Sequence, residues 1–313
     1  MEHFKKLIDD SSFQLYNYDS LKIGCLLGEG ASAKVYSTYF NGKEYAAKIY
    51  KNNEYEGFYD DLSYELKIAK RLKNSKYSVN VHSIGYGFIN NKFKIILFMD
   101  LLKSYGDLYD YIQNIATWRA CYKVQNKLIP KPKTNYIYYN EDDKVYWCYE
   151  LSKKQKVRIT KMVLQSINEL HLNGIIHGDI KTDNMILHYE YRKEIIKLID
   201  FGMSYLSEGD ECINMEYISG THGYRAPEQD EFKISFSSDI YSMGVTIIEI
   251  WNGDIWKNGE TFDDLRKEVL LGLDNIEKEN KEFAILLKKC ISYEYQKRPH
   301  ISTVFQIFSK ISF

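Results

Sequence analysis

His-Gly-Asp-Ile-Lys-Thr-Asp-Asn occupies residues 177–184, and Asp-Phe-Gly follows at residues 200–202. The first stretch places Asp179, Lys181 and Asn184 on one short loop, and the second adds another carboxylate. An acidic group for a hydroxyl proton, a lysine beside phosphate oxygens, and an amide and a carboxylate for Mg²⁺ are the groups that phosphoryl transfer uses. The two stretches therefore indicate phosphoryl-transfer chemistry.

The charge balance of the chain argues against several other classes. Its 313 residues include 42 basic and 43 acidic side chains, so the chain has no excess of positive charge that would attract nucleic acid or an anionic membrane. The longest apolar runs, such as residues 95–99, are too short to span a bilayer. We therefore expect neither a nucleic acid nor a membrane as a partner.

The distribution of cysteine and histidine residues gives no sign of disulfide bonds or of a structural metal site. The five cysteines are scattered and odd in number, without a Cys-x-x-Cys pair, and no secretory leader is recognisable. This pattern fits a reducing intracellular compartment, most simply the cytoplasm. The seven histidines are equally dispersed, so we expect no structural zinc.

The first third of the chain reads mainly as strands. Asn41-Gly42 separates two such runs and predicts a type I′ hairpin. One helix is predicted over residues 60–72 from apolar residues at helical spacing. Those residues are Leu62, Leu66, Ala69 and Leu72.

The pattern changes to helices after residue 150. One apolar stripe ends before Asn173-Gly174, a helix stop signal. The stripe consists of Ile159, Val163, Ile167 and Leu170. A second helix, over residues 240–251, follows the capping candidates Ser237 and Ser238 and is apolar on nearly all sides, so we expect it to be buried.

These changes in pattern suggest the organisation of the chain. We expect an N-terminal extension at 1–20, a small unit at 21–102 and a larger unit at 103–313, with a surface insertion at about 118–150. The insertion is either a docking or regulatory element or a tolerated loop, and the latter is favoured because long irregular loops often carry no chemistry.

Two further features are ambiguous when each is taken alone. Residues 28–35, Gly-Glu-Gly-Ala-Ser-Ala-Lys-Val, form either a phosphate-binding turn or an ordinary hairpin turn. Lys48 lies in an apolar run and is either a buried lysine paired with Glu65 or an edge-strand lysine with Glu65 on the surface.

The order and spacing of all these motifs resemble the eukaryotic-type protein kinases, Ser/Thr branch, over about residues 21–308. The matching positions are Gly28, Gly30, Val35, Lys48, Glu65, His177, Asp179, Asn184, Asp200-Phe201-Gly202 and Ala226-Pro227-Glu228. The resemblance implies an α+β, bilobal fold, with a small, mainly antiparallel β N-lobe holding one helix and a larger, mainly α C-lobe.

The resemblance also implies a role for each matched residue. Asp179 would orient the substrate hydroxyl and accept its proton, and Lys181 would neutralise charge on the phosphoryl group. Asn184 and Asp200 would hold Mg²⁺ on ATP. The residues implied for ATP binding are Leu27, Gly28, Gly30, Val35, Ala46, Lys48, Glu65, Met99, Asp100, Leu102 and Ile186. Asp239 would brace the catalytic loop, residues 177–184, and Arg298 would pair with Glu228; both would be scaffold residues.

The acceptor and the mode of activation follow from single residues. Lys181 and Gly220-Thr221 resemble the Ser/Thr-specific branch, and Met203 favours Ser over Thr. Gly178 stands where most family members have an arginine that binds a phosphate on the activation segment, the stretch that follows Asp200-Phe201-Gly202 and that Ala226-Pro227-Glu228 closes. We therefore expect activity without phosphorylation of that segment.

Ala33 replaces the third glycine of the Gly-rich loop, and we expect a modest effect on nucleotide affinity.

Two alternatives to this reading remain. A pseudokinase scaffold would keep the fold without the chemistry, although degenerate members usually lack at least one of the motif residues that are present here. A small-molecule phosphotransferase shares a similar Asp-x-x-x-x-Asn loop, but such enzymes generally lack the Ala-Pro-Glu motif and its arginine partner.

Overall fold

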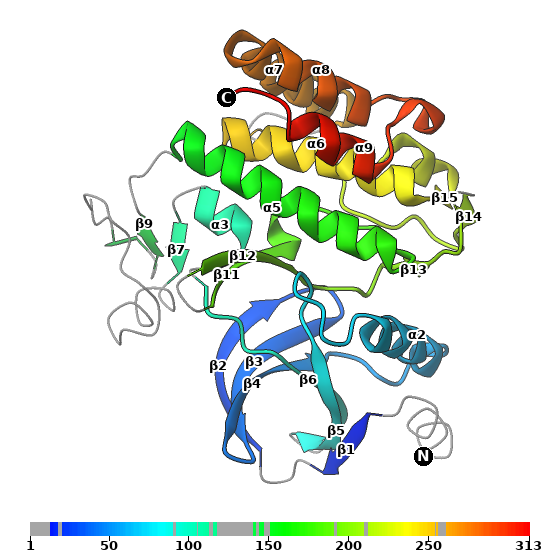
Figure 1. Cartoon of the computed structure of the whole chain (residues 1–313). Coiled ribbons are helices and arrows are strands. Elements are labelled where there is room, and N and C mark those ends of the chain that lie inside the picture. Colours follow the sequence, from blue (N-terminus) through cyan, green and yellow to red (C-terminus); the bar gives the residue numbers. More distant parts are fainter. Residues whose placement is uncertain are drawn as a thin grey trace. The chain divides into compact units, whose positions relative to one another are not determined.

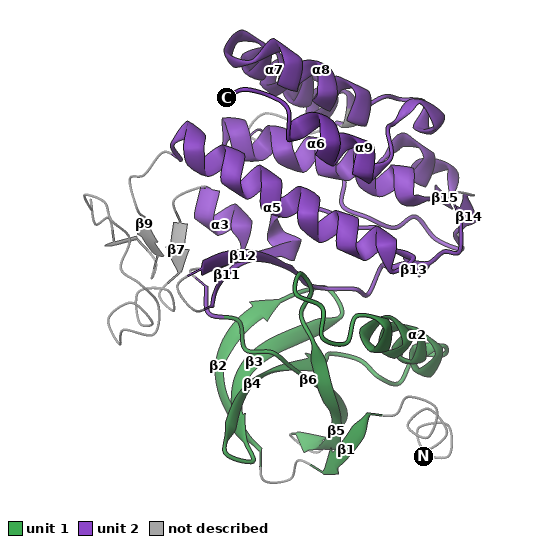
Figure 2. Cartoon of the chain, in the orientation of Figure 1, with its two compact units in different colours: residues 1–102 green, residues 103–313 purple. Residues whose placement is uncertain are grey.

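The structure is a computed structural model, and it divides the chain into two compact units, residues 1–102 and 103–313 (Figure 2). It describes residues 13–17, 21–89, 92–104, 106–112, 115–117, 140–141, 144–146, 151–190, 193–209, 212–253, 255 and 261–313. Most of the expected insertion at 118–150, and with it any test of its role, lies outside these residues.

A six-stranded sheet forms most of the first unit (Figure 1). Its strands are β1 (Gln14–Asn17), β2 (Lys22–Glu29), β3 (Ala33–Phe40), β4 (Lys43–Tyr50), β5 (Val81–Ile89) and β6 (Lys92–Met99), in the order β1-β5-β6-β4-β3-β2. Neighbouring strands are antiparallel except β1, which pairs with β5 in parallel. The sequence did not predict β1, which lies in the expected N-terminal extension.

The predicted hairpin between β3 and β4 is confirmed. Phe40 pairs with Lys43, and the two residues between them, Asn41 and Gly42, have φ of 49° and 79°. Positive φ at both central residues defines a type I′ turn, whose twist matches that of the flanking strands.

Helix α2 (Phe58–Arg71) is the helix expected at 60–72. Its buried residues Phe58, Leu62, Leu66 and Ala69 recur at helical spacing. The first three join a cluster with Ala33, Tyr50, Ile84, Ile95 and Leu97 from the sheet. The helix is thus held to the sheet through one apolar face.

The described part of the second unit is mainly helical. Its helices are α3 (Leu108–Ile112), α5 (Lys153–Leu172), α6 (Phe236–Asn252), α7 (Phe262–Glu279), α8 (Lys281–Cys290) and α9 (Ile301–Phe308), with 3₁₀ turns η1 (Thr182–Asn184), η2 (Pro227–Glu231) and η3 (Tyr295–Lys297). Its paired strands are β7 (Ile115–Thr117), β8 (Asn140–Glu141), β9 (Lys144–Tyr146), β10 (Ile175–Ile176), β11 (Met185–Glu190), β12 (Lys193–Leu198), β13 (Tyr205–Leu206), β14 (Ile213–Asn214) and β15 (Lys233–Ile234).

The expected stop of helix α5 is confirmed, whereas the expected start of α6 is wrong. Asn173 caps α5, and Gly174 follows with φ of 65°. Helix α6 begins at Phe236 with Ser235 as its N-cap, because the backbone N–H of Ser235 donates to Ser238 Oγ over 3.0 Å. Every residue from Ser238 to Trp251 is buried, so the expectation of a buried helix is confirmed.

Within the ranges given above, no helix is both long enough and apolar enough to cross a membrane.

Candidate active site

The turn between β2 and β3 carries the two glycines of the Gly-rich motif. A Cβ built on Gly28 would meet nothing within 4 Å among the described residues, and one on Gly30 would meet only the Ala33 carbonyl at 3.9 Å. Neither glycine has φ in the left-handed region. Packing and backbone geometry therefore do not require glycine here, whereas close approach of ligand phosphates to the backbone would.

Ala33, at the third glycine position, has a different environment. Its side chain is 4% exposed and belongs to the cluster that α2 buries. The methyl group therefore contributes to the core of the first unit. Leu27 and Val35, on the strands beside the turn, are half-buried.

Lys48 and Glu65 form the expected ion pair. Lys48 lies on β4, which has β3 on one side and β6 on the other, and it is only 6% exposed. Its Nζ lies 2.6 Å from Glu65 Oε1. The alternative of an edge-strand lysine is thus wrong. Glu65 also accepts a hydrogen bond from Tyr50, over 2.7 Å.

The end of β6 provides the residues expected at the back of the nucleotide pocket and in the hinge. Ala46 on β4 lies opposite Met99. The next residue, Asp100, accepts a hydrogen bond from Asn80 Nδ2 over 3.0 Å and lies 2.6 Å from His82 Nε2. Partial burial raises the pKa of Asp100, but the hydrogen bonds from His82 and Asn80 outweigh it, and the net pKa lies below its ordinary value.

The Asp100 carboxylate is engaged in this way and its N–H donates to the Asn80 carbonyl over 3.0 Å, so its main-chain carbonyl is the polar group that Asp100 could offer a nucleotide. Leu102, the last residue of the first unit, is half-buried. Ile186 belongs to the second unit, where it is half-buried on β11 opposite Lys197 of β12.

In the second unit, the Asp179 carboxylate has hydrogen-bond donors on both oxygens. Oδ1 accepts from the backbone N–H and the hydroxyl of Thr221, over 2.8 and 2.7 Å. Oδ2 accepts from Asn184 Nδ2 over 2.8 Å and lies 3.2 Å from Lys181 Nζ. Lys181 also donates to the Thr221 hydroxyl over 2.6 Å. The structure thus brings together Asp179, Lys181 and Asn184, and adds Thr221.

The chemistry of the donor set fits a magnesium ion. Asn184 Nδ2 donates to both the carbonyl and the carboxylate of Asp179, so the amide oxygen is the atom of this side chain that could bind a cation. The Ile199 N–H binds the Asn184 carbonyl over 3.0 Å, next to the exposed Asp200. Asp200 has φ of 59°, a conformation that costs energy outside glycine and is common at functional sites.

No group of three or more His, Cys, Asp or Glu residues that could hold a metal occurs in the described part of the chain. Mg²⁺ needs no such group, because it usually keeps waters and binds through one or two protein ligands and substrate phosphates. Two ligands such as the candidates Asn184 and Asp200 would therefore be enough to hold it together with substrate phosphates.

The backbone of the catalytic loop is held by Asp239 of helix α6, as expected. The Asp239 carboxylate accepts from the N–H groups of His177 and Gly178, over 2.8 and 3.0 Å, and lies 2.9 Å from His171 Nε2. Ser204 adds a hydrogen bond to the His177 carbonyl over 2.9 Å. These contacts fix the residues immediately before Asp179.

Gly178 is in close backbone contact with the activation segment. Its φ is 79°, and a Cβ at this position would lie 2.3 Å from the Met203 carbonyl oxygen. The side chain of Gln229, which is 1% exposed, donates to the carbonyls of Gly178 and Ser219, each over 3.2 Å. A neutral amide thus connects the catalytic loop to the end of the activation segment.

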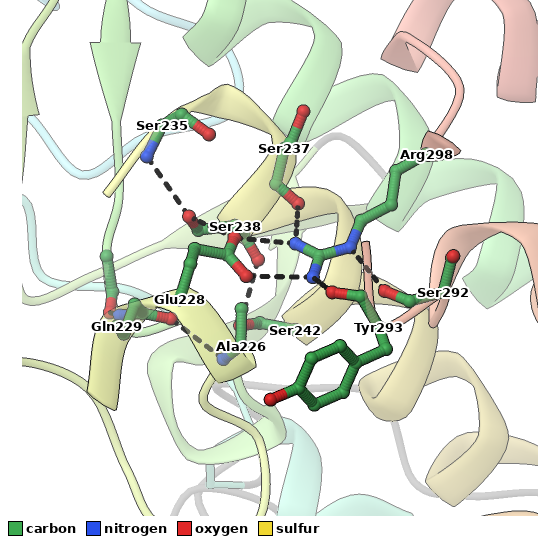
Figure 3. Close-up of polar contacts among 11 residues, drawn as sticks. Ala226, Glu228, Gln229, Ser235, Ser237, Ser238, Ser242, Ser292, Tyr293 and Arg298 are labelled. Atoms are coloured by element: carbon green, nitrogen blue, oxygen red, sulfur yellow. Dashed lines mark hydrogen bonds and ion pairs between the residues drawn. The ribbon is translucent and has the colours of Figure 1, made fainter. Parts of the chain in front are cut away.

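The expected pair of Glu228 and Arg298 is present and fully buried (Figure 3). Arg298 NH1 and NH2 bind the two carboxylate oxygens of Glu228 over 2.6 and 2.8 Å. Ser238 donates to the same carboxylate over 2.7 Å, and Arg298 also binds the carbonyls of Ser237 and Ser292. This pair anchors the end of the activation segment to the helical unit.

Sequence reasoning missed several residues of the site. Gln229 and Tyr50 act through partners distant in sequence, so local patterns gave no signal. Asp107 was also missed, although its place before α3 is a helix-capping signal: its Oδ1 accepts from the Asp110 N–H over 2.8 Å. Burial and the charges of Asp110 and Asp183 raise the pKa of Asp107 to about 7.

The fold and this arrangement of residues are typical of the protein kinase class. The chain belongs to the protein kinase family, because the family model for the protein kinase domain matches residues 21–308. The α+β fold predicted from the sequence is thereby confirmed, and the matched region covers most of both units. The family uses ATP as the phosphoryl donor and usually Mg²⁺.

Curated relatives match at low identity. The chain is 24% identical over 302 residues to a probable serine/threonine-protein kinase, gdt4, of Dictyostelium discoideum, covering 94% of the chain and 16% of that protein. It is 25% identical over 309 residues to the LRR receptor-like serine/threonine-protein kinase FEI 2 of Arabidopsis thaliana, covering 92% and 46%. The dual specificity protein kinase zak2 of D. discoideum is 31% identical over 182 residues, covering 53% and 26%. The chain thus spans less than half the length of each.

Proposed function

We propose that the chain transfers the γ-phosphoryl group of ATP, with Mg²⁺, to Ser or Thr hydroxyls of protein substrates. The observation that carries this proposal is the Asp179 carboxylate, held on both oxygens by Thr221, Asn184 and Lys181. A carboxylate oriented in this way is suited to direct a hydroxyl group and take its proton.

In the proposed reaction, the substrate hydroxyl oxygen bonds to the γ-phosphorus, the bond from that phosphorus to the β,γ-bridging oxygen breaks, and ADP leaves. Asp179 orients the hydroxyl and accepts its proton, and the Lys181 ammonium offsets negative charge on the phosphoryl oxygens. Lys48 binds ATP phosphates while Glu65 holds it in place. Mg²⁺, when bound by Asn184 and Asp200, neutralises charge on the phosphates.

We further propose that this activity does not depend on phosphorylation of the activation segment. The candidate sites Ser204, Ser207 and Ser219 are all buried, and their hydroxyls donate to His177, Gly209 and Met215. The Gln229 amide supplies uncharged contacts where an arginine–phosphate pair would otherwise connect the segments. Glu208 and Glu216 further disfavour added negative charge nearby.

Two observations favour a Ser or Thr acceptor. Lys181 reaches the Thr221 hydroxyl, so the two residues that resemble the Ser/Thr branch in sequence are in contact. Several curated relatives are named serine/threonine-protein kinases, and one is named a dual specificity kinase. Serine is expected to be the preferred acceptor because Met203 follows the Asp-Phe-Gly motif.

The test is transfer of label from γ-labelled ATP to a generic protein substrate, with and without Mg²⁺. We expect wild type and the surface control Asp263→Asn to transfer label, and Asp179→Asn and Asp200→Asn to lose roughly 10²-fold or more of that rate, since each loses a charged group at the reacting centre. Transfer that persists in both site variants would refute the mechanism, and ATP binding without transfer would instead indicate a pseudokinase. Labelling of a sugar or antibiotic, with none of any protein, would indicate a small-molecule phosphotransferase.

The phosphorylation proposal is tested on phosphatase-treated wild type. We expect activity to stay within about twofold of the untreated enzyme, because no phosphate contact is needed to hold the segment. A large loss that is restored by phosphate on Ser204, Ser207 or Ser219 would contradict it.

A further inference from the structure

Tyr50 binds the same carboxylate that Lys48 pairs with. The two residues are two positions apart on β4, so their side chains leave the same face of the strand. Tyr50 Oη donates to Glu65 Oε2 over 2.7 Å, while Lys48 Nζ binds Glu65 Oε1 over 2.6 Å. Each oxygen of the Glu65 carboxylate therefore has a donor from β4.

The ring of Tyr50 is fixed independently of its hydroxyl. It is buried in the apolar cluster and meets the ring of Phe58 edge to face, with centroids 5.2 Å apart and an interplanar angle of 82°. Phe58 is the first residue of α2, and Glu65 follows two turns later, about 10 Å along the helix axis. One side chain of the sheet thus contacts α2 at two separated points.

The contacts of Tyr50 with Phe58 and Glu65 restrict the direction of the Glu65 carboxylate, which the Lys48 ammonium alone does not. A lysine ammonium is a point charge on a flexible stem, so it sets the distance to a carboxylate more than its direction. A packed tyrosine ring has little rotamer freedom, and its O–H···O⁻ hydrogen bond is directional. The Tyr50 hydroxyl therefore sets the orientation of Glu65, and Glu65 in turn sets where the Lys48 ammonium lies.

We infer that Tyr50 is a positioning residue that holds Glu65, and through it Lys48, in the geometry that binds nucleotide phosphates. It acts through Glu65 and touches no reacting atom. The inference rests on the proposed phosphoryl transfer, and it adds a residue that the kinase motifs do not include.

The chain provides a matched control. Tyr55 Oη donates to Asp61 Oδ2 over 2.6 Å, and the ring of Tyr55 meets that of Phe58 with centroids 5.5 Å apart at 83°. Tyr55→Phe therefore removes a tyrosine–carboxylate hydrogen bond to the same helix without touching the Lys48 partner. Tyr50→Phe keeps the ring and removes only the hydroxyl, so both variants retain the apolar packing.

The experiment measures kcat and KM for ATP in both variants, alone and combined with Glu65→Gln. Tyr50→Phe is expected to lower kcat/KM for ATP on the order of tenfold, the size of one lost hydrogen bond to a charged group. Tyr55→Phe should stay within about twofold of wild type, as expected for a hydrogen bond in water. In the Glu65→Gln background, Tyr50→Phe should have little further effect, because both changes act on one interaction.

Hydrogen exchange of the α2 amides, residues 58–71, gives a readout that needs no activity. We expect faster exchange in Tyr50→Phe than in Tyr55→Phe. Equal kinetics and equal exchange in the two variants would overturn the inference, as would an effect of Tyr50→Phe that is undiminished in the Glu65→Gln background. An inactive wild type would refute the proposed function instead, and the exchange comparison would still decide the role of Tyr50.

Discussion

The close contact at Gly178 gives a sharp prediction for the variant Gly178→Ala. The new methyl group would meet the Met203 carbonyl oxygen at 2.3 Å, and the Gly178 backbone is held by other contacts. Gly178 donates its N–H to Asp239, and its carbonyl accepts from Gln229. The site therefore has little freedom to relax, and the arginine common at this position in the family would need the same Cβ.

Two effects contribute to the loss of stability that we expect in Gly178→Ala. Placing a non-glycine residue at φ of 79° costs roughly 1–2 kcal/mol. Forcing a methyl group into a packed site costs typically about 1–3 kcal/mol more. Gly178→Ala should thus lower the free energy of unfolding by about 2–5 kcal/mol. Gly42 provides the control, because it also has φ of 79° but its Cβ would meet nothing within 4 Å. Gly42→Ala should therefore lower the free energy of unfolding only by the backbone cost, roughly 1–2 kcal/mol.

Urea unfolding of wild type, Gly178→Ala and Gly42→Ala, followed by circular dichroism, measures both costs. Gly178→Ala should also lower kcat, since a shift of Met203 moves the segment that begins at Asp200. If Gly178→Ala is no less stable than Gly42→Ala and keeps full activity, the close contact does not hold the activation segment.

Two other predictions concern buried charges. Arg298→Met leaves the buried Glu228 carboxylate without its positively charged partner. Urea unfolding should show a free energy of unfolding lower by about 3–5 kcal/mol. The loss should be smaller in the double variant that adds Glu228→Gln, because no unpaired charge is then buried. Asp107 has a pKa raised to about 7 by burial and by neighbouring carboxylates, so its contribution to stability is lost as pH rises from about 4 through 7. Asp107→Asn should therefore be more stable than wild type at pH 8 and similar at pH 4, and an equal difference at both pH values would contradict this assignment.

Local sequence signals were sufficient for elements whose determinants are close in the chain. Asn41-Gly42 predicts the hairpin because two adjacent residues define the turn type. The apolar spacing before Asn173 predicts the body and end of α5. The start of α6 was misplaced because three serines precede the apolar run, and only the backbone geometry decides that Ser235 is the cap.

The candidate catalytic residues could be proposed from the sequence because they lie in short motifs at spacings that resemble those of the family. The residues that orient them could not, because their contacts cross long stretches of sequence. Tyr50 meets Glu65 over 15 positions, Thr221 meets Asp179 over 42, and Gln229 meets Gly178 over 51. A repeating sequence pattern cannot indicate pairs that are so far apart in the chain. Strand β1 was missed for the same reason, because its partner strand β5 begins more than 60 residues later.

The central claim is that Asp179 directs phosphoryl transfer to Ser or Thr without a phosphate on the activation segment. The most direct measurement incubates phosphatase-treated wild type and Asp179→Asn with γ-labelled ATP, Mg²⁺ and a peptide library, then identifies the labelled residue. We predict labelled serine, and less labelled threonine, with wild type only. Label on tyrosine alone, no transfer by the dephosphorylated enzyme, or equal transfer by Asp179→Asn would contradict the account.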